Sequence, residues 1–229
     1  MERGGSPSEI GVPVAFIESA WRRYTKHSRN KAQEIQGAIL PLQRTHHRAA
    51  PFLGAVLAGV FTAGSVDQLR SLGFSVLHFP YDTAVRAFAT VGINASYSED
   101  TSDKDCAKKV KRWEALSEKR RKRVAAALVD LNREEVDKFI GKLTRTIRRH
   151  ISPIRVLPLH GTSAEYPSPE KAINFIQEYE EGSNSHPFVK YEIAILFNNG
   201  DRIDAVFRDK LDAVQFLQEY QGPSLSPAV

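Results

Sequence analysis

The chain has little cysteine and no long apolar run, and each of these absences excludes a class of protein. Cys106 is the only cysteine among 229 residues, so a disulfide framework is excluded and secretion is not indicated. No apolar run approaches the roughly 20 residues that a membrane span needs. Residues 1–13 also lack an apolar stretch of signal-peptide length. We therefore expect a cytoplasmic protein that has no contact with a membrane.

A phosphate-binding glycine loop is missing as well. Gly54, Gly59 and Gly64 are regularly spaced, but no Lys-Ser or Lys-Thr pair follows them, so nucleotide hydrolysis is not supported. The chain is 41% hydrophobic and 26% charged, which is ordinary for a globular protein of one or two domains.

Positive charge is concentrated in the middle of the chain. Residues 101–150 hold 16 Lys and Arg against 8 Asp and Glu, whereas residues 151–229 hold 6 against 11. The densest run consists of Lys119, Arg120, Arg121, Lys122 and Arg123. Such a density can release counterions from a phosphate backbone, which indicates DNA binding. A solvated helical face is the alternative interpretation.

The first part of the chain alternates buried strands with amphipathic helices. Apolar runs predict strands at 12–18, 52–61 and 74–80, and helical spacing predicts helices at about 28–47, 65–72 and 82–91. This order implies parallel strands with crossover helices, and therefore an α/β core. We expect the first strand to end at Glu18, and Ser65 to cap the second helix in a capping box with Gln68.

A polar stretch at 92–105 reads as a linker, and basic helices follow it up to about residue 150. The last of these helices is predicted to begin at Asn132, with Asn132 as its cap and Glu135 as the reciprocal partner. The helix has an apolar stripe spaced for burial, which leaves its basic residues on the other face.

Beyond Pro153 the sequence repeats itself. Residues 172–179 match residues 213–220, and an apparent hairpin precedes each copy. The first hairpin is predicted at 154–159 and 163–166 with a turn at His160 and Gly161, and the second at 191–197 and 202–207 with a turn at Asn199-Gly200. One ββα copy cannot bury its sheet face alone, so the two copies are predicted to form one four-stranded layer under two helices. The domains expected are an α/β core at 1–100, a basic helical segment at 101–150 and a duplicated ββα module of α+β class at 151–229. The acidic module is a candidate surface for a protein partner.

The stretch that carries the most chemistry runs from Ile17 to Ile35. Glu18 is followed by Trp-Arg-Arg, then by His-Ser-Arg-Asn-Lys, and then by a helix that contains Glu34. Carboxylate oxygens hold Mg²⁺, and a nearby lysine orients water and offsets the charge of a phosphate under attack. In this stretch, and in the order of elements through Phe79, the chain resembles the PD-(D/E)xK nucleases, the restriction-endonuclease-like superfamily. The resemblance covers roughly residues 12–95.

The resemblance implies a DNA-binding protein that hydrolyses phosphodiesters with Mg²⁺, built on a shortened form of the nuclease core. Glu18 takes the acidic position of the Glu-x-Lys motif, but Ala20 stands at the lysine position. Lys26 and Lys31 are therefore the candidates for the catalytic lysine, and Glu34 completes the candidate catalytic set. The family's second metal ligand lies on an earlier strand, for which Glu9 is the stand-in beside Glu18.

Arg22 and Arg23, together with residues 119–123, are the expected DNA contacts. Enzymes of this kind that cut both strands often work as dimers, so the resemblance also implies a homodimer. A different reading stays open, in which the chain is a non-catalytic nucleic-acid-binding or protein-interaction module derived from a nuclease. In that case Glu18 only ends a strand and Glu34 pairs with a basic neighbour on the surface.

Overall fold

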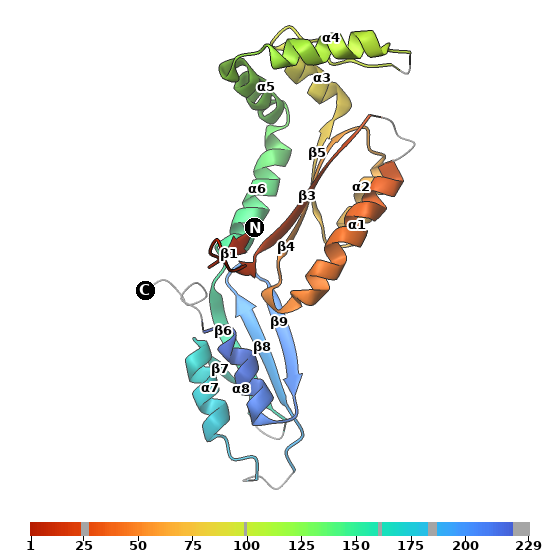
Figure 1. Cartoon of the computed structure of the whole chain (residues 1–229). Helices are drawn as coiled ribbons and strands as arrows, with labels where there is room; N and C mark the ends of the chain where they lie inside the picture. Colours follow the sequence, from red (N-terminus) through yellow and green to blue (C-terminus); the bar gives the residue numbers. More distant parts are fainter. Residues whose placement is uncertain (24–27, 99, 160–161, 183–186, 222–229) are drawn as a thin grey trace. The chain divides into compact units, whose positions relative to one another are not determined.

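The computed structural model describes residues 1–23, 28–98, 100–159, 162–182 and 187–221 (Figure 1). The chain divides into two compact units, Met1–Thr144 and Arg145–Val229. Each unit has a sheet covered by helices. The α/β class expected from the sequence is confirmed. The helices of the basic stretch up to Thr144 belong to the first unit.

A parallel sheet of three strands forms the centre of the first unit. Its strands are β3 (Ala15–Arg22), β4 (Phe52–Gly59) and β5 (Ser75–Pro80), in the order β3-β4-β5. A short hairpin of β1 (Glu2–Arg3) and β2 (Val12–Pro13) precedes them. Because the strands are parallel, their carboxyl ends lie at one edge of the sheet. The parallel strands expected from the sequence are confirmed.

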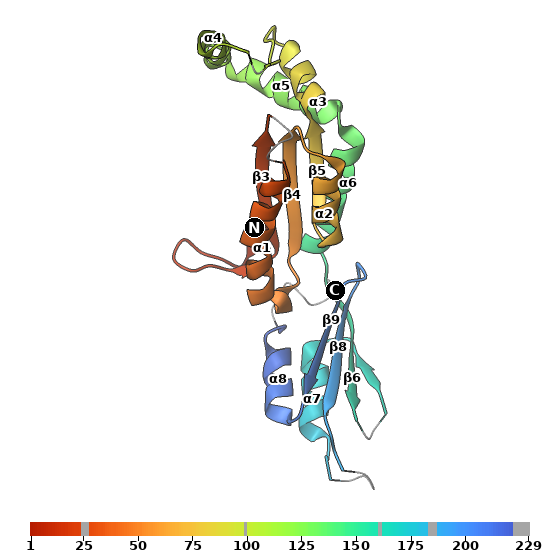
Figure 2. The same cartoon turned by 90° about the vertical axis from the view of Figure 1, so that its right-hand side faces the viewer.

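Helices cover both faces of this sheet (Figures 1 and 2). One face carries α1 (Ser28–Thr45) and α2 (Ala63–Ser71), and the other carries α6 (Arg133–Ile147). Leu53 and Leu57 of β4 enter the core under α1 and α2, whereas Phe52 meets Phe139 of α6 edge to face at 5.4 Å. This division follows from the period of two along a strand.

Three further helices gather beyond the carboxyl end of β5 (Figure 1). They are α3 (Tyr81–Ala89), α4 (Asp103–Glu114) and α5 (Glu118–Asp130), while a 3₁₀ helix, η2 (His47–Ala49), precedes β4. The three share a small core of their own, in which the rings of Phe88 and Trp113 lie 5.3 Å apart.

Several predicted element bounds are wrong: Val12 and Pro13 form the separate strand β2, and the strand predicted at 52–61 ends at Gly59. Glu18 does not end its strand, because Trp21 and Arg22 continue the pairing of β3 with β4. Their side chains alternate between the two faces of the sheet, so a polar-looking segment still fits a strand. The cap of α2 is Thr62, whose hydroxyl accepts from the backbone N–H of Ser65 at 3.2 Å, and Ser65 itself lies within the helix.

The second unit is the duplicated module. Its sheet has the order β7-β6-β8-β9, with every neighbouring pair antiparallel. Its elements are β6 (Ile151–Pro158), β7 (Ala164–Tyr166), α7 (Pro169–Glu178), β8 (Tyr191–Phe197), β9 (Arg202–Phe207) and α8 (Lys210–Gln218). The expected four-stranded layer with two helices packed together is confirmed. The turn predicted at His160 and Gly161 lies outside the described residues.

None of the helices in the described part of the chain has both the length and the apolar composition that a membrane crossing requires.

Candidate functional site

Two carboxylates and two cations lie together between β3 and α1. Glu18 and Arg22 share one face of β3, and Lys31 and Glu34 come from the start of α1. Lys31 Nζ lies 3.7 Å from Glu18 Oε1 and 3.1 Å from Glu34 Oε2, and Arg22 Nη2 lies 3.6 Å from the same Glu34 oxygen. We call these four residues the β3–α1 charge cluster. It contains three of the four candidate catalytic residues.

The carboxylates of this cluster are more exposed than its lysine. The side chain of Lys31 is 19% exposed, against 40% for Glu18 and 55% for Glu34, so a ligand from solvent reaches the carboxylate oxygens first. Arg22 Nε is buried and has no hydrogen-bond partner among the described residues. Ion pairs with this much exposure contribute only about 0–1 kcal/mol to stability. The arrangement is therefore not explained by stability alone.

The donor set fits Mg²⁺ only in part. Mg²⁺ is commonly held by one or two carboxylates, with water and substrate phosphate completing its shell. Glu18 and Glu34 flank one ammonium group and meet that minimum. No group of three or more His, Cys, Asp or Glu that suits a metal occurs among the described residues. The described part of the chain would therefore supply at most these two ligands.

Of the two remaining sequence candidates for this site, the structure describes only Glu9. Glu9 is exposed between β1 and β2, where its backbone bonds to that of Ser6, and within the described residues it does not form a metal-binding group with Glu18. Lys26 lies outside the described residues. The structure thus brings together Glu18, Lys31 and Glu34, adds Arg22 to them, and gives no such support to Glu9.

The five consecutive basic residues of α5 have different environments. Arg120 donates to the carbonyl of Val91 at 2.7 Å, and Arg121 donates to the carbonyl of Glu114 at 2.7 Å. Lys122 pairs with Glu118 at 2.7 Å. Lys119 and Arg123 are exposed and lie one turn apart. Their side chains have no hydrogen-bond or ion-pair partner in the described part of the chain. Two of the five therefore remain available to an anion without breaking a contact.

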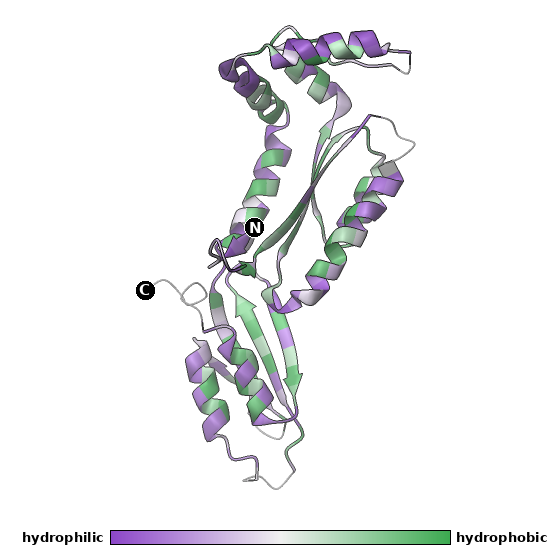
Figure 3. Ribbon diagram, in the orientation of Figure 1, coloured by the Kyte–Doolittle hydropathy of each residue, from purple (hydrophilic) through white to green (hydrophobic). Residues whose placement is uncertain are grey.

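Helix α4 adds further cations of the same kind. Lys104, Lys111 and Arg112 are exposed and unpaired within the residues that the structure describes. Figure 3 shows the hydrophilic character of α4 and of the first turns of α5. We call Lys104, Lys111, Arg112, Lys119 and Arg123 the α4–α5 cations.

Lys138 and Arg149 of the basic stretch are already compensated, whereas Arg145 and Arg148 are exposed with no side-chain partner among the described residues. Lys138 pairs with Glu134 at 2.7 Å and with Glu135 at 3.2 Å, and these contacts raise the pKa of Lys138 and lower that of Glu134. Arg149, in the second unit, is buried and pairs with Asp201 at 2.5 Å. Uncompensated charge of the stretch is therefore found on α4 and α5, and also at Arg145 and Arg148.

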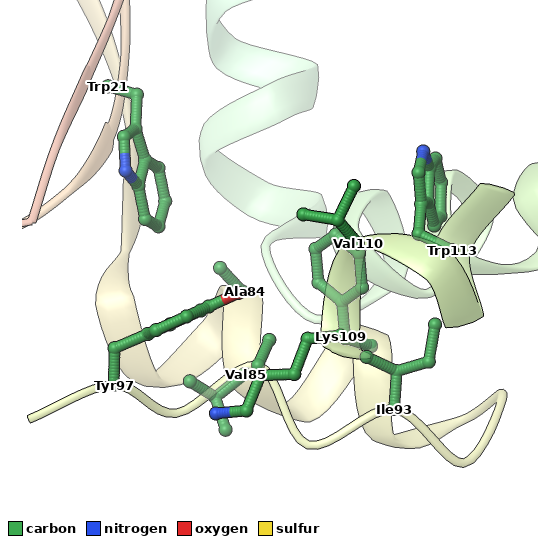
Figure 4. Close-up of a pocket in the computed structure, with 10 residues that line it drawn as sticks. Trp21, Ala84, Val85, Ile93, Tyr97, Lys109, Val110 and Trp113 are labelled. Carbon is green, nitrogen blue, oxygen red and sulfur yellow. The ribbon is translucent and has the colours of Figure 1, made fainter. Parts of the chain in front are cut away.

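An apolar pocket of about 320 Å³ lies at the carboxyl end of β3 (Figure 4). Its lining includes Trp21 of β3, Phe88 of α3, Tyr97 of the following connection, and Val110 and Trp113 of α4. Burial raises the pKa of the Tyr97 hydroxyl, with a smaller contribution from Cys106, so this ring is uncharged at neutral pH. The sequence analysis missed the pocket because its residues come from four separate segments.

Of the predicted DNA contacts, Arg23 lies beside this pocket and Arg22 does not. Arg23 donates to the carbonyl of Ser98 and its guanidinium lies 4.9 Å from the centre of the Tyr97 ring. Arg22 lies next to it in sequence but belongs to the β3–α1 charge cluster on the opposite face of the strand from Trp21.

Comparison of the chain with protein-family models, with curated proteins and with solved structures gave no match. Its function is therefore inferred from these residues and their geometry alone.

Proposed function

We propose that the chain is a DNA-binding protein of the restriction-endonuclease-like kind, which holds the phosphate backbone with the α4–α5 cations. The observation that carries this proposal is that five exposed cations on two consecutive helices lack a carboxylate partner among the described residues. Each cation that neutralises a phosphate releases condensed counterions, and this release is the main source of affinity for DNA.

The contrast between the first two turns of α5 and those of α6 favours this proposal over a merely solvated helical face. On α6, Lys138 has Glu134 and Glu135 within reach at helical spacing, as is typical of a solvated face. On α5, Glu118 pairs with Lys122, and Lys119 and Arg123 stay uncompensated. Leaving like charges one turn apart costs stability, which a polyanionic ligand would recover.

Phosphodiester hydrolysis is the second candidate function, and the β3–α1 charge cluster favours it. Glu18 and Glu34 would hold Mg²⁺, which supplies Lewis-acid activation of the phosphate and lowers the pKa of bound water. Lys31 places a positive charge within 4 Å of both carboxylates, where it offsets charge that develops on a phosphate. The partly exposed carboxylates leave room for DNA to approach.

Salt-dependent binding of duplex DNA tests the first proposal. The slope of log K against log salt is negative, and we expect its magnitude to decrease by roughly 2 in Lys119→Gln/Arg123→Gln, because each lost phosphate contact removes about 0.9. Lys171→Gln/Arg208→Gln is the matched control, since both residues are exposed, unpaired in the described chain and located in the second unit. Equal slopes for the two double variants would overturn the proposal.

Cleavage of duplex DNA in Mg²⁺ tests the second candidate. Glu18→Gln keeps the shape of the side chain and removes its charge, so we expect it to abolish cutting. It should leave the binding affinity within a factor of about 5, since an exposed ion pair of this kind is worth under about 1 kcal/mol. Glu165→Gln is the control, because Glu165 also forms an exposed ion pair, with Arg155 at 2.6 Å, but lies in the second unit. A wild-type chain that binds DNA and never cuts it would leave binding as the function and remove hydrolysis.

A further inference from the structure

We infer that the apolar pocket at the carboxyl end of β3 takes one unpaired nucleobase of DNA, an inference that deepens the proposed DNA binding and rests on it. A parallel α/β sheet commonly binds its ligands outside the carboxyl ends of its strands. Trp21 stands one residue before the end of β3, and α3 begins directly after β5. The pocket therefore lies at the carboxyl edge of the sheet.

The size and lining of the pocket suit a flat ring. A cavity of about 150 Å³ takes one benzene ring, and this pocket of about 320 Å³ is roughly twice as large. Trp21, Tyr97 and Trp113 offer aromatic surface from three different segments (Figure 4). Trp21 is 49% exposed, so its ring is available to a ligand from solvent. Stacking on such rings is how proteins hold unpaired bases.

The charges around the pocket indicate that its ligand is anionic as well as aromatic. Lys109 Nζ lies 4.1 Å from the centre of the Tyr97 ring and donates to the carbonyl of Ser96. Arg121 lies 5.6 Å from the centre of the Trp113 ring and donates to the carbonyl of Glu114. Carbonyls and rings position these cations without cancelling their charge, unlike a carboxylate. A nucleotide can stack its base on the rings and pair its phosphates with the cations.

The composition of the pocket also predicts how little it discriminates among bases. Apart from Lys109 and the Tyr97 hydroxyl, the side chains that line it are apolar or indole rings. Reading a base requires hydrogen-bond groups aimed at its edge, whereas stacking tolerates every base. We expect short oligothymidylate and oligodeoxyadenylate to bind with affinities within about tenfold of each other.

The chain carries a built-in reporter for the experiment. It has two tryptophans, Trp21 and Trp113, and both line the pocket. We expect short oligothymidylate to quench the tryptophan fluorescence of the full chain, and an abasic strand of equal length to quench it much less. Base stacking is worth about 1–3 kcal/mol, so Trp21→Ala should weaken binding of oligothymidylate by roughly 5- to 150-fold and Trp21→Phe by far less.

Two controls separate this inference from the proposed function. Leu211→Ala removes a 76% exposed apolar residue of the second unit and should change no affinity. Trp21→Ala should leave fully paired duplex binding unchanged, whereas Lys119→Gln/Arg123→Gln should weaken it. The base pocket would be overturned if oligothymidylate bound no better than the abasic strand. It would also be overturned if oligothymidylate bound equally well to the wild type and to Trp21→Ala. Neither result would affect the proposed duplex binding. Preference of more than tenfold for oligouridylate would overturn its assignment to DNA. A wild-type chain that binds oligothymidylate but no fully paired duplex would overturn only the proposed duplex binding.

Discussion

At the scale of single residues, Gly59 shows how closely β3 and β4 approach. It ends β4 with φ of +95°, and a Cβ at this position would lie 2.0 Å from the carbonyl oxygen of Arg22, which accepts from Val60 N–H at 2.7 Å. We expect Gly59→Ala to lower the free energy of unfolding of the first unit by about 1–3 kcal/mol. Urea unfolding followed by tryptophan fluorescence measures it.

Gly64→Ala is the matched control for that prediction. Gly64 lies in α2 with no atom within 4 Å of an added Cβ, and alanine favours a helix by about 1 kcal/mol over glycine. This variant should be at least as stable as the wild type. If Gly59→Ala matched it, the close approach of Arg22 and Gly59 would be refuted.

Sequence reasoning found the residues of the β3–α1 charge cluster but not those of the pocket, and the physical reason is distance along the chain. Glu18, Lys31 and Glu34 belong to one strand and the next helix, so a single strand-helix connection brings them together. Trp21 and Trp113 are 92 positions apart, and no periodicity relates them. Such a pair becomes visible only after the helices are packed.

At the scale of elements, Asn132 joins the connection between α5 and α6 to β5. Its Nδ2 donates to the carbonyl of His78 at 2.9 Å. The sequence indicated only a helix cap, a role that aspartate fills as well as asparagine. We expect Asn132→Asp to lower the free energy of unfolding of the first unit by about 1–3 kcal/mol, because a carboxylate cannot donate to the partly buried carbonyl.

Thermal unfolding measures the loss of stability in Asn132→Asp. Asn174→Asp is the control, because it makes the same amide-to-carboxylate change at a different site. Asn174 is exposed on α7 of the second unit, and such surface substitutions usually change stability by no more than about 0.5 kcal/mol. Equal effects of the two variants would mean that Asn132 acts as a cap and not as a donor.

The elements that sequence patterns predicted well are those with a strong local signal. The second hairpin of the duplicated module was expected at Tyr191–Phe197 and Arg202–Phe207, and β8 and β9 have these bounds. The connection contains Asn199-Gly200 as expected, but only Gly200 has a positive φ, of +91°, whereas the tight two-residue turn that this dipeptide favours requires a positive φ at both residues. The end of β3 was misjudged because Glu18, Ser19 and Arg22 interrupt its apolar run, although the pairing with β4 continues to Arg22.

At the scale of the whole molecule, packing and not charge sets the units. The charge distribution led us to predict a basic segment at 101–150 separate from the core. In the structure, Phe139 of α6 packs on Phe52 of the sheet, and Arg120 of α5 donates to the carbonyl of Val91. Apolar stripes on basic helices tie them to the sheet and leave their cations outward. The same helices thus complete a core and present the α4–α5 cations.

Because each unit has its own core, we expect the two to unfold in separate transitions. Trp21 and Trp113 both belong to the first unit, so fluorescence follows that unit, whereas far-UV circular dichroism follows both. Tyr191 is fully buried in the second unit and its hydroxyl donates to Glu181 at 2.9 Å. Tyr191→Phe should lower the stability of the second unit by about 1 kcal/mol and leave the midpoint measured by fluorescence unchanged.

The pH dependence of the stability of the second unit provides a second test at Tyr191. Burial, together with the hydrogen bond to Glu181, raises the pKa of Tyr191 above its ordinary value of about 10. A phenol with a raised folded-state pKa stabilises the fold fully below the unfolded pKa and loses that contribution as the pH rises further. Above about pH 10 the second unit should therefore weaken, and Tyr191→Phe should weaken less. A fluorescence midpoint that moved with Tyr191→Phe would show that the two units unfold together.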